Sequence, residues 1–353
     1  MYEALMKKMD STDKTVQRPP IESLLSERIL ILDGAMGTMI QRYALSEQDF
    51  RGPRFSDHPV SLRGNNDVLS LTRPDVVEEI HRAYLDAGAD IIETNTFSST
   101  TIAQADYRFE PHVEEMNRRS AEIARKAADD FTLKDPSKPR YVAGAIGPTN
   151  KTASISPNVN DPGYRAISFD ELKTAFKQQM IALHQGGVDM FLIETVIDTL
   201  NAKAALMAAF EFRDQTGTDI PVMLSGTITD ASGRTLSGQT TEAFLISVSH
   251  YPLLSIGLNC ALGAANMLPY IKELSRKANC FISVYPNAGL PNEMGLYDQS
   301  PESMTAELRE FLEGGLANIV GGCCGTSPDH IRAIAHMARN YPPRKRNRQA
   351  IHD

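Results

Sequence analysis

The sequence predicts an α/β fold in which a single domain closes into a (β/α)₈ TIM barrel. The main observation is a short apolar, β-branched run followed by an amphipathic stretch of helical length, and this unit recurs eight times. Strands that alternate with helices form parallel sheets with right-handed crossovers. The length of 353 residues also suits one barrel with insertions. Eight repeats favour a closed barrel over an open sheet, although the spacing by itself is compatible with both.

The predicted strands are short and follow one another at regular intervals. They cover residues 29–33, 90–94, 141–146, 190–194, 222–225, 255–258, 281–285 and 317–320. The clearest predicted helices cover residues 74–87, 169–185, 199–212, 241–250, 264–277, 301–314 and 328–339. Ser327 before Pro328 is a typical helix start, and Gly88, Gly186 and Gly314 stand where helices must end.

The chain outside these repeats is polar. Residues 1–20 end in two prolines and are expected to form a flexible lead-in, residues 21–340 to form the barrel, and residues 341–353 to form a basic tail. Two long insertions, 39–72 and 150–168, follow the first and third predicted strands. We expect both insertions to shape the mouth of the barrel.

The composition narrows the class of protein. Hydrophobic residues make up 42% of the chain and charged residues 23%, as in a soluble globular enzyme. The net charge of −8 argues against a nucleic-acid surface, which is normally basic. No apolar run is long enough for a membrane span, and the first residues do not resemble a secretory signal. We therefore expect a cytoplasmic protein whose thiols stay reduced.

Cysteines are the most informative residues of the predicted rim. Cys260 follows the sixth strand, and Cys323 and Cys324 follow the eighth, so all three are expected at the carboxyl ends of strands, where barrel active sites lie. Adjacent side chains in a strand point to opposite faces, but Gly321, Gly322 and Gly325 permit a turn that brings both thiols together. Cys280 begins the seventh strand, and we expect it to be a small buried residue.

Three thiolates suit zinc and leave its fourth position open, as in a catalytic site. Such a site carries a net charge of about −1, since three thiolates outweigh the divalent ion. It is therefore a poor Lewis acid for hydrolysis but well suited to activating a fourth thiol as a nucleophile. Two alternatives stay open at this point: the Gly-Gly-Cys-Cys-Gly run is only a tight backbone turn, or the vicinal thiols form a redox pair.

Nine stretches of the chain resemble the homocysteine S-methyltransferase family. Among its branches, the similarity is closest to the N-terminal homocysteine-binding module of cobalamin-dependent methionine synthases. The matching stretches span roughly residues 20–340 and are ILDGAMGTMIQ (31–41), GNND (64–67), GADIIETNTFSSTT (88–101), GPTNKTASISP (147–157), IETVIDTLNAKAA (193–205), SGTITDASGRTLSGQTTEA (225–243), GLNCALG (257–263), PNAGLPN (286–292) and GGCCGT (321–326).

The resemblance implies a (β/α)₈ barrel with zinc on Cys260, Cys323 and Cys324, L-homocysteine as methyl acceptor and methionine as product. In the cobalamin-dependent branch, methylcobalamin on a separate module donates the methyl group and is recharged from 5-methyltetrahydrofolate on a second barrel. Neither module is part of these 353 residues, so we expect cobalamin-binding and methyltetrahydrofolate-binding modules or chains as partners. The alternatives are a stand-alone enzyme that uses S-methylmethionine or betaine, and a non-catalytic module that only loads homocysteine.

Homocysteine also carries an ammonium and a carboxylate group, which need partners in the site. Glu194 is the first candidate for the ammonium, with Glu93 and Asp33 as alternates. Backbone N–H groups would receive the carboxylate, and Ser225 would add a hydroxyl; the N–H candidates are Gly34, Ala35 and Met36. The Asn287 amide oxygen is expected to fill the fourth zinc position when substrate is absent. The competing roles are an arginine partner for Glu194, a cap on the 34–37 turn for Asp33, and turn formation for Asn287.

Overall fold

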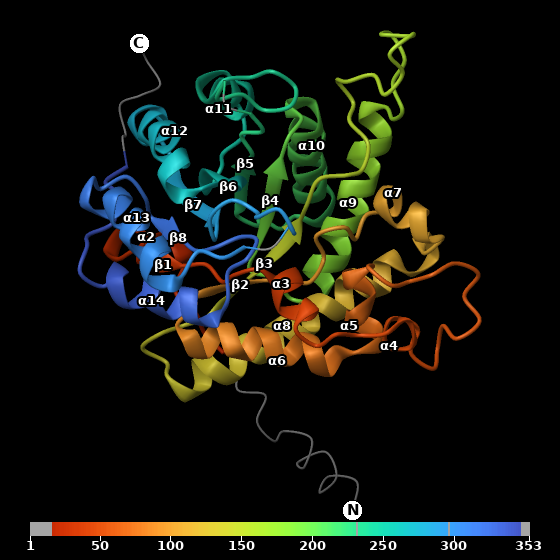
Figure 1. The fold of residues 1–353 in the computed structure, drawn as a ribbon, viewed down its shortest axis with the longest axis horizontal. Helices are drawn as coiled ribbons and strands as arrows, with labels where there is room; N and C mark the ends of the chain where they lie inside the picture. The colour runs from red at the N-terminus through yellow and green to blue at the C-terminus, as the bar shows by residue number, and fades with distance from the viewer. Residues whose placement is uncertain (1–15, 231, 296, 347–353) are drawn as a thin grey trace, which may run out of the picture.

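Eight parallel strands form one sheet in the computed structural model, which describes residues 16–230, 232–295 and 297–346. The strands are hydrogen-bonded in the order β1-β8-β7-β6-β5-β4-β3-β2, and a bridge between Leu32 and Ile91 joins the two ends of this sheet. Helices surround the strands (Figure 1). The predicted TIM barrel is therefore confirmed. Its strands are β1 (Leu30–Ile31), β2 (Ile91–Glu93), β3 (Tyr141–Ile146), β4 (Met190–Val196), β5 (Val222–Gly226), β6 (Ser255–Gly263), β7 (Phe281–Asn287) and β8 (Ile319–Val320).

The seven predicted helices all have a counterpart that begins at the predicted residue and ends within four residues of the predicted end. The α-helices are α2 (Ile21–Glu27), α3 (Met36–Gln41), α4 (Glu47–Arg51), α5 (Leu69–Thr72), α6 (Pro74–Ala87), α7 (Thr101–Gln104), α8 (Val113–Lys134), α9 (Phe169–Gln185), α10 (Thr199–Thr216), α11 (Thr241–Val248), α12 (Ala264–Lys277), α13 (Pro301–Glu313) and α14 (Pro328–Ala338). Three short 3₁₀ helices cover Asn66–Val68, Ala105–Tyr107 and Glu110–His112. The bounds of β3, α6, α9 and α12 are those predicted.

Two parts of the architecture were not given in the prediction. Helix α8 is the longest of the described helices; a helix was expected after β2, but no residue range was predicted for it. The insertion at residues 39–72 is partly helical: it contains α4, which begins with a capping box at Ser46, and α5. The insertion at residues 150–168 contains no helix or strand.

The barrel interior is a separate apolar cluster that runs from its base to the candidate site. Leu30, Leu192 and Phe281 belong to this cluster, and Ile21 and Leu25 of α2 close its lower end. Cys323 packs against the same cluster. The floor of the site is therefore a packed core rather than an open channel.

Residues from both predicted flanking segments contact the barrel. The Arg18 guanidinium donates to the Arg140 carbonyl oxygen at 2.6 Å, and the Tyr141 hydroxyl donates to the Pro19 carbonyl oxygen at 2.6 Å. Arg344 is buried, and it donates to the carbonyl oxygens of Ala278 (2.7 Å) and Cys280 (3.0 Å). Residues 1–15 and 347–353 of the predicted lead-in and tail lie outside the described residues. Within the described chain, no helix combines the length and apolar character that a membrane crossing requires.

Candidate metal centre

Three cysteine sulfurs meet at the carboxyl ends of β6 and β8. The Sγ atoms of Cys260, Cys323 and Cys324 all lie within 4.8 Å of one another, and those of Cys260 and Cys324 are 3.9 Å apart. Tetrahedral Zn–S bonds of about 2.3 Å place two sulfurs about 3.8 Å apart. These three residues could therefore hold a metal ion. Cys280 is buried and does not belong to this group.

The backbone around Cys260 makes this convergence possible. Strand β6 leaves its regular pairing with β7 between Asn259 and Gly263. Cys260 and Ala261 have φ values of 58° and 54°, in the left-handed region that residues with a Cβ rarely adopt. The predicted strand ended at residue 258, so the sequence did not reveal that the turn of β6 lies on the cysteine itself.

Strand β7 holds the other two cysteines in place. The Cys323 N–H donates to the Pro286 carbonyl oxygen at 2.8 Å, and the Cys324 carbonyl oxygen accepts from the Ala288 N–H at 2.9 Å. Gly325 has a φ of 80°, which agrees with the prediction that glycines allow the chain to turn here. Hydrogen bonds from the neighbouring thiols of Cys260 and Cys323 lower the pKa of Cys324, whereas the same contacts and burial raise the pKa of Cys323, so the cluster favours a thiolate at Cys324 alone.

The three candidate carboxylates for an ammonium group lie beside the cysteines. Asp33 and Glu194 are buried and Glu93 is partly buried, and none of them forms an ion pair with an arginine, lysine or histidine of the described chain. Burial raises the pKa of Glu93 to about 7. Burial and the charge of Glu93 raise the pKa values of both Asp33 and Glu194. The arginine partner considered for Glu194 is therefore not found among the described residues, and the cluster lacks a compensating cation.

Asp33 bridges two strands rather than capping a turn. Its Oδ2 accepts from the Glu93 N–H at 3.1 Å, and its Oδ1 is buried and has no hydrogen-bond partner in the described part of the chain. Helix α3 has no side-chain N-cap, so the capping role considered for Asp33 is wrong. Three backbone N–H groups were predicted to donate to the substrate carboxylate, and that of Ala35 already donates to Thr326 Oγ1 at 3.1 Å. Gly34 and Met36 stay predictions.

Asn287 ends strand β7, directly before the residue that bonds to the Cys324 carbonyl. Its side chain is 1% exposed, and its Oδ1 atom has no hydrogen-bond partner among the described residues. A buried amide oxygen without a donor is costly, and a metal ion is one group that would satisfy it. The three thiols thus fit zinc, and the Asn287 amide oxygen stays a predicted fourth ligand.

Asn259 is a residue that the sequence analysis did not select. It is fully buried, and its side chain contacts Thr195, Glu194, Ser225 and Cys323. The Ser225 hydroxyl, which we expected to contact substrate, is also fully buried and donates to Asn259 Oδ1 at 2.7 Å. The position of Asn259 directly before Cys260 was the only available signal for its role.

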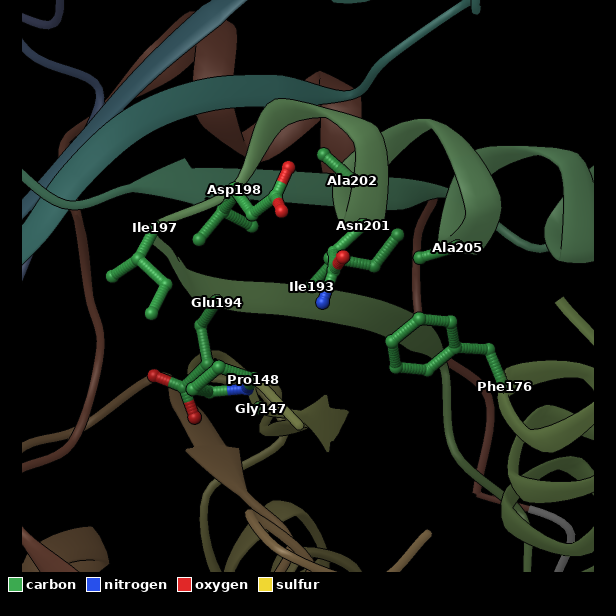
Figure 2. A pocket seen from close by; sticks show the side chains of 11 residues that line it. Gly147, Pro148, Phe176, Ile193, Glu194, Ile197, Asp198, Asn201, Ala202 and Ala205 are labelled. Carbon is green, nitrogen blue, oxygen red and sulfur yellow. The ribbon is translucent and has the colours of Figure 1, made fainter. Parts of the chain in front are cut away.

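A small pocket opens beside Glu194, between the end of β3 and the start of α10. Figure 2 shows its lining, to which Gly147 and Pro148 contribute from the β3 side and Asp198 and Asn201 from the α10 side. Phe176 of α9 and the side chains of Ala202 and Ala205 make its other wall apolar. Glu194 therefore lies between the cysteine cluster and this pocket.

Solved structures with the same fold include a methyltransferase. The metallated form of the homocysteine methyltransferase MmuM from Escherichia coli is 22% identical, covers 90% of this chain and 99% of its own, and has a TM-score of 0.70. The oxidized form of that protein is 21% identical, with the same coverage and a TM-score of 0.71. At this identity the similarity concerns the fold. The sequence model of the homocysteine S-methyltransferase family matches residues 30–338, which is most of the chain. The chain belongs to the homocysteine S-methyltransferase family.

Proposed function

We propose that this chain transfers a methyl group to the thiol of L-homocysteine and forms methionine, with zinc held by Cys260, Cys323 and Cys324. The observation that carries the proposal is the meeting of three sulfurs within 4.8 Å, from two separate rim segments, beside buried carboxylates that lack a cation. Family membership supports the methyl acceptor. The metallated form of the E. coli homocysteine methyltransferase supports a metal in this fold.

The cysteines and Asn287 supply the donor set. Zinc, when bound, lowers the pKa of a coordinated thiol so that a thiolate is available near neutral pH. The three protein thiolates leave the site with excess negative charge, which keeps a substrate sulfur electron-rich. Asn287 would offer its unpartnered Oδ1 atom as a further ligand to the ion when homocysteine is absent.

The carboxylates orient the substrate. Glu194, with Glu93 and Asp33 beside it, accepts the ammonium of homocysteine, whose positive charge compensates the cluster. The N–H groups of Gly34 and Met36 receive the substrate carboxylate. In the transfer itself, the substrate sulfur uses a lone pair to form the S–CH₃ bond, the bond between methyl and donor breaks, and its electron pair stays on the donor. The thiol proton leaves to water.

The methyl donor in this proposal is methylcobalamin, presented by a cobalamin-binding module or chain and recharged by a methyltetrahydrofolate-binding one. The supporting observation is the similarity of residues 158–165 and 225–238 to the cobalamin-dependent branch. Free thiols in the described chain fit a reducing compartment, and we propose the cytoplasm.

The experiment supplies purified chain with homocysteine and one donor at a time: methylcobalamin, S-methylmethionine or betaine. Methionine formation from methylcobalamin is the expected result. If methionine forms only with S-methylmethionine or betaine, methylcobalamin is not the donor and the effective compound takes its place. Zinc binding without methionine from any donor would identify a homocysteine-loading module, and the absence of both would overturn the proposal.

X-ray absorption at the zinc edge tests the ligand set directly. We expect three sulfurs and one lighter atom in the zinc-loaded protein, and four sulfurs after homocysteine is added. An unchanged spectrum on addition of homocysteine would contradict thiol coordination even if methionine is formed.

A further inference from the structure

We propose that Asn259 is a positioning residue whose single side chain couples the ammonium site at Glu194 to the metal site at Cys323. This inference rests on the proposed function. Asn259 is the last residue of β6 that pairs regularly with β7, and the next residue is a proposed zinc ligand. The side chain is fully buried, so each of its polar atoms needs a partner within the protein.

The hydrogen bonds fix which end of the amide faces the site. The Thr195 backbone N–H lies 3.0 Å from Oδ1, and an N–H group can only donate. The Ser225 hydroxyl donates to the same oxygen at 2.7 Å. Both lone pairs of Oδ1 are therefore used, and the NH₂ group must point the other way.

The NH₂ group lies between the two halves of the site. It donates to Thr195 Oγ1 at 2.8 Å, and it faces both Glu194 Oε2 at 3.4 Å and Cys323 Sγ at 3.8 Å. One N–H is thus fixed by Thr195 and the other is shared by a carboxylate and a sulfur. A donor in this position can bond to either acceptor and so orients both of them.

The backbone on either side of this amide is strained. Thr195, directly after Glu194, has a φ of 53°, and strand β4 has an irregular register there. Cys260 and Ala261 are also left-handed. Left-handed residues with a Cβ persist only when their surroundings hold them, and Asn259 bonds to both the N–H and the hydroxyl of Thr195. Asn259 therefore stabilises the backbone that presents Glu194 as well as the cysteine that follows it.

Asn259→Asp is the most direct test, because the substitution keeps the shape and the acceptor but replaces the NH₂ group with a negatively charged oxygen. We expect zinc affinity, measured by chelator competition, to fall about 10- to 100-fold, as for other residues that support metal ligands. We expect KM for homocysteine to rise as well. In the cobalt-substituted protein, the thiolate-to-cobalt absorption bands should shift.

Asn318→Asp is the matched control. Asn318 is equally buried but lies at the base of the barrel, where its amide donates to the carbonyl oxygens of Leu25 and Arg344. This variant should lose stability and bind zinc with wild-type affinity. Ser225→Ala, which removes one donor to Asn259, should change zinc affinity and KM in the same direction as Asn259→Asp but less.

Two results separate this inference from the proposed function. If the wild-type chain binds zinc and forms methionine but Asn259→Asp leaves zinc affinity, KM and the cobalt spectrum unchanged, the positioning role is wrong and the function stands. If the wild-type chain itself binds no zinc and forms no methionine, the function fails, and the inference fails with it.

Discussion

At the scale of single residues, the four cysteines divide into one cluster and one buried residue. Cys260, Cys323 and Cys324 share a site, whereas Cys280 is 6% exposed and packs in the core between sheet and helices. This division provides a test with an internal control, since all four substitutions to alanine remove the same thiol.

Alanine at Cys260, Cys323 or Cys324 should abolish zinc binding and lower methionine formation by more than about 100-fold, because changes to supporting residues alone cost about 10- to 100-fold. Cys280→Ala should keep zinc binding and methionine formation. Its free energy of unfolding should fall only slightly, because a small buried side chain is shortened. Metal analysis of the four purified variants together with the methyl-transfer assay checks this. Retained zinc in any of the three cluster variants would contradict the ligand set.

The carboxylate cluster predicts a pH effect on the metal-free protein. The pKa of Glu93 is about 7 in the folded chain and near 4.5 when unfolded. Between these values the folded state binds more protons, so this group makes stability fall as the pH rises from about 4.5 to 7. Below 4.5 its contribution is fully present.

Glu93→Gln removes this titration, because the amide stays neutral. The pH profile of urea unfolding should therefore be less steep between pH 4.5 and 7 for the variant than for the wild-type chain. Asp67, whose pKa burial raises to about 6, titrates in the same window, so the difference between the two profiles is the relevant quantity. Identical slopes would show that Glu93 is ionised in the fold.

The position of the candidate site residues at the rim was predictable, but their backbone conformations were not. Polar residues directly after apolar runs identified Glu194 and Cys260 as rim residues. The left-handed backbone at Thr195 and Cys260 was hidden, because neither residue type favours that conformation and the hydrogen bonds that hold it come from a neighbouring strand. Asn259 was missed for the same reason, since its partners are up to 65 positions away.

At the scale of elements, three strands are directly preceded by a residue whose side chain accepts a hydrogen bond from the backbone of a neighbouring strand. Asp90, before β2, accepts from the Ile31 N–H at 2.9 Å; Asp189, before β4, accepts from the Val142 N–H at 2.7 Å; and Asn318, before β8, accepts from the Ile282 N–H at 3.0 Å. These residues stand two, three and four positions after the glycines that end the preceding helices, which are Gly88, Gly186 and Gly314. The short segments between these glycines and the following Asp or Asn thus determine both where the helix ends and how the next strand aligns with its neighbour.

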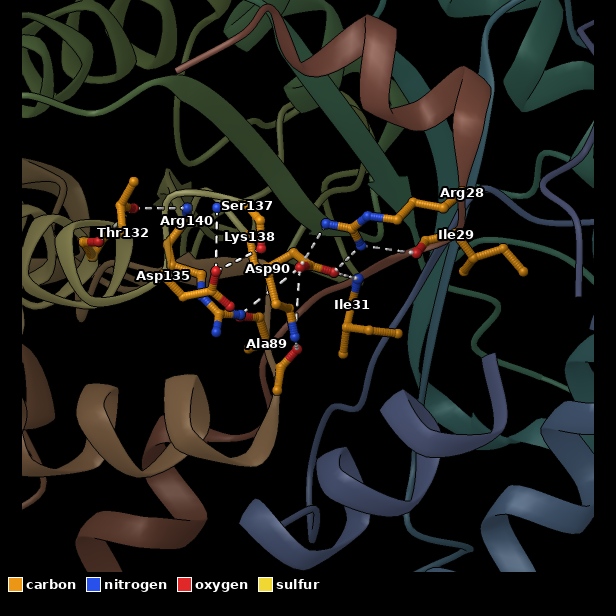
Figure 3. A network of polar contacts seen from close by, with 12 residues as sticks. Arg28, Ile29, Ile31, Ala89, Asp90, Thr132, Asp135, Ser137, Lys138 and Arg140 are labelled. Atoms are coloured by element: carbon orange, nitrogen blue, oxygen red, sulfur yellow. Dashed lines mark hydrogen bonds and ion pairs between the residues drawn. The ribbon is translucent and has the colours of Figure 1, made fainter. Parts of the chain in front are cut away.

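Among these residues, Asp90 contributes most to closing the barrel, because it lies at the seam, which is the junction between β1 and β2 where the two ends of the sheet meet. Strands β1 and β2 are joined by one bridge, and the Asp90 carboxylate adds a further bond across that gap. Figure 3 shows the cations around it: Arg28 binds both carboxylate oxygens, and Lys138 and Arg140 each lie 3.8 Å away. Removing this carboxylate leaves several cations without their shared partner.

Asp90→Ala should therefore lower the free energy of unfolding by about 3–5 kcal/mol, the range for breaking a buried ion pair from one side. Asp189→Ala is the control, because Asp189 has the same position before its strand but is more exposed and binds a single arginine, Arg125. Urea unfolding of both variants should give a clearly smaller loss for Asp189→Ala. Equal losses would show that closure of the seam does not depend on the buried charge.

Sequence patterns predicted the exact bounds of some helices and only the presence of others. Helices α6 and α12 match their predicted bounds, whereas α8 follows β2, where a helix was expected without a residue range. Strands β4 and β6 continue beyond their predicted ends because polar rim residues, Thr195 and Asn259 among them, remain in the sheet. A prediction that relies on the apolar pattern alone therefore places the ends of such strands too early.

At the scale of the whole molecule, the residues that tie the fold together and those of the candidate site lie at opposite ends of the barrel. The base holds Asp90, Asn318 and Arg344, whose partners tie strands and chain ends together. The upper rim holds the cysteines and the uncompensated carboxylates, with strained backbone and unsatisfied oxygens at Asp33 and Asn287. The rim is thus the part of the fold that a ligand can stabilise.

Zinc should for this reason raise the stability of the whole chain. An ion that binds only the folded state adds about 2.7 kcal/mol when its free concentration is 100 times Kd. Urea unfolding with zinc, with a chelator, and with zinc plus homocysteine should give increasing stability in the order chelator, zinc, zinc plus homocysteine. Homocysteine without zinc should add little, because its thiol then has no ion to bind. Cys260→Ala should show none of these increments, and a wild-type response in that variant would mean that the ion binds elsewhere and that the rim cysteines do not hold it.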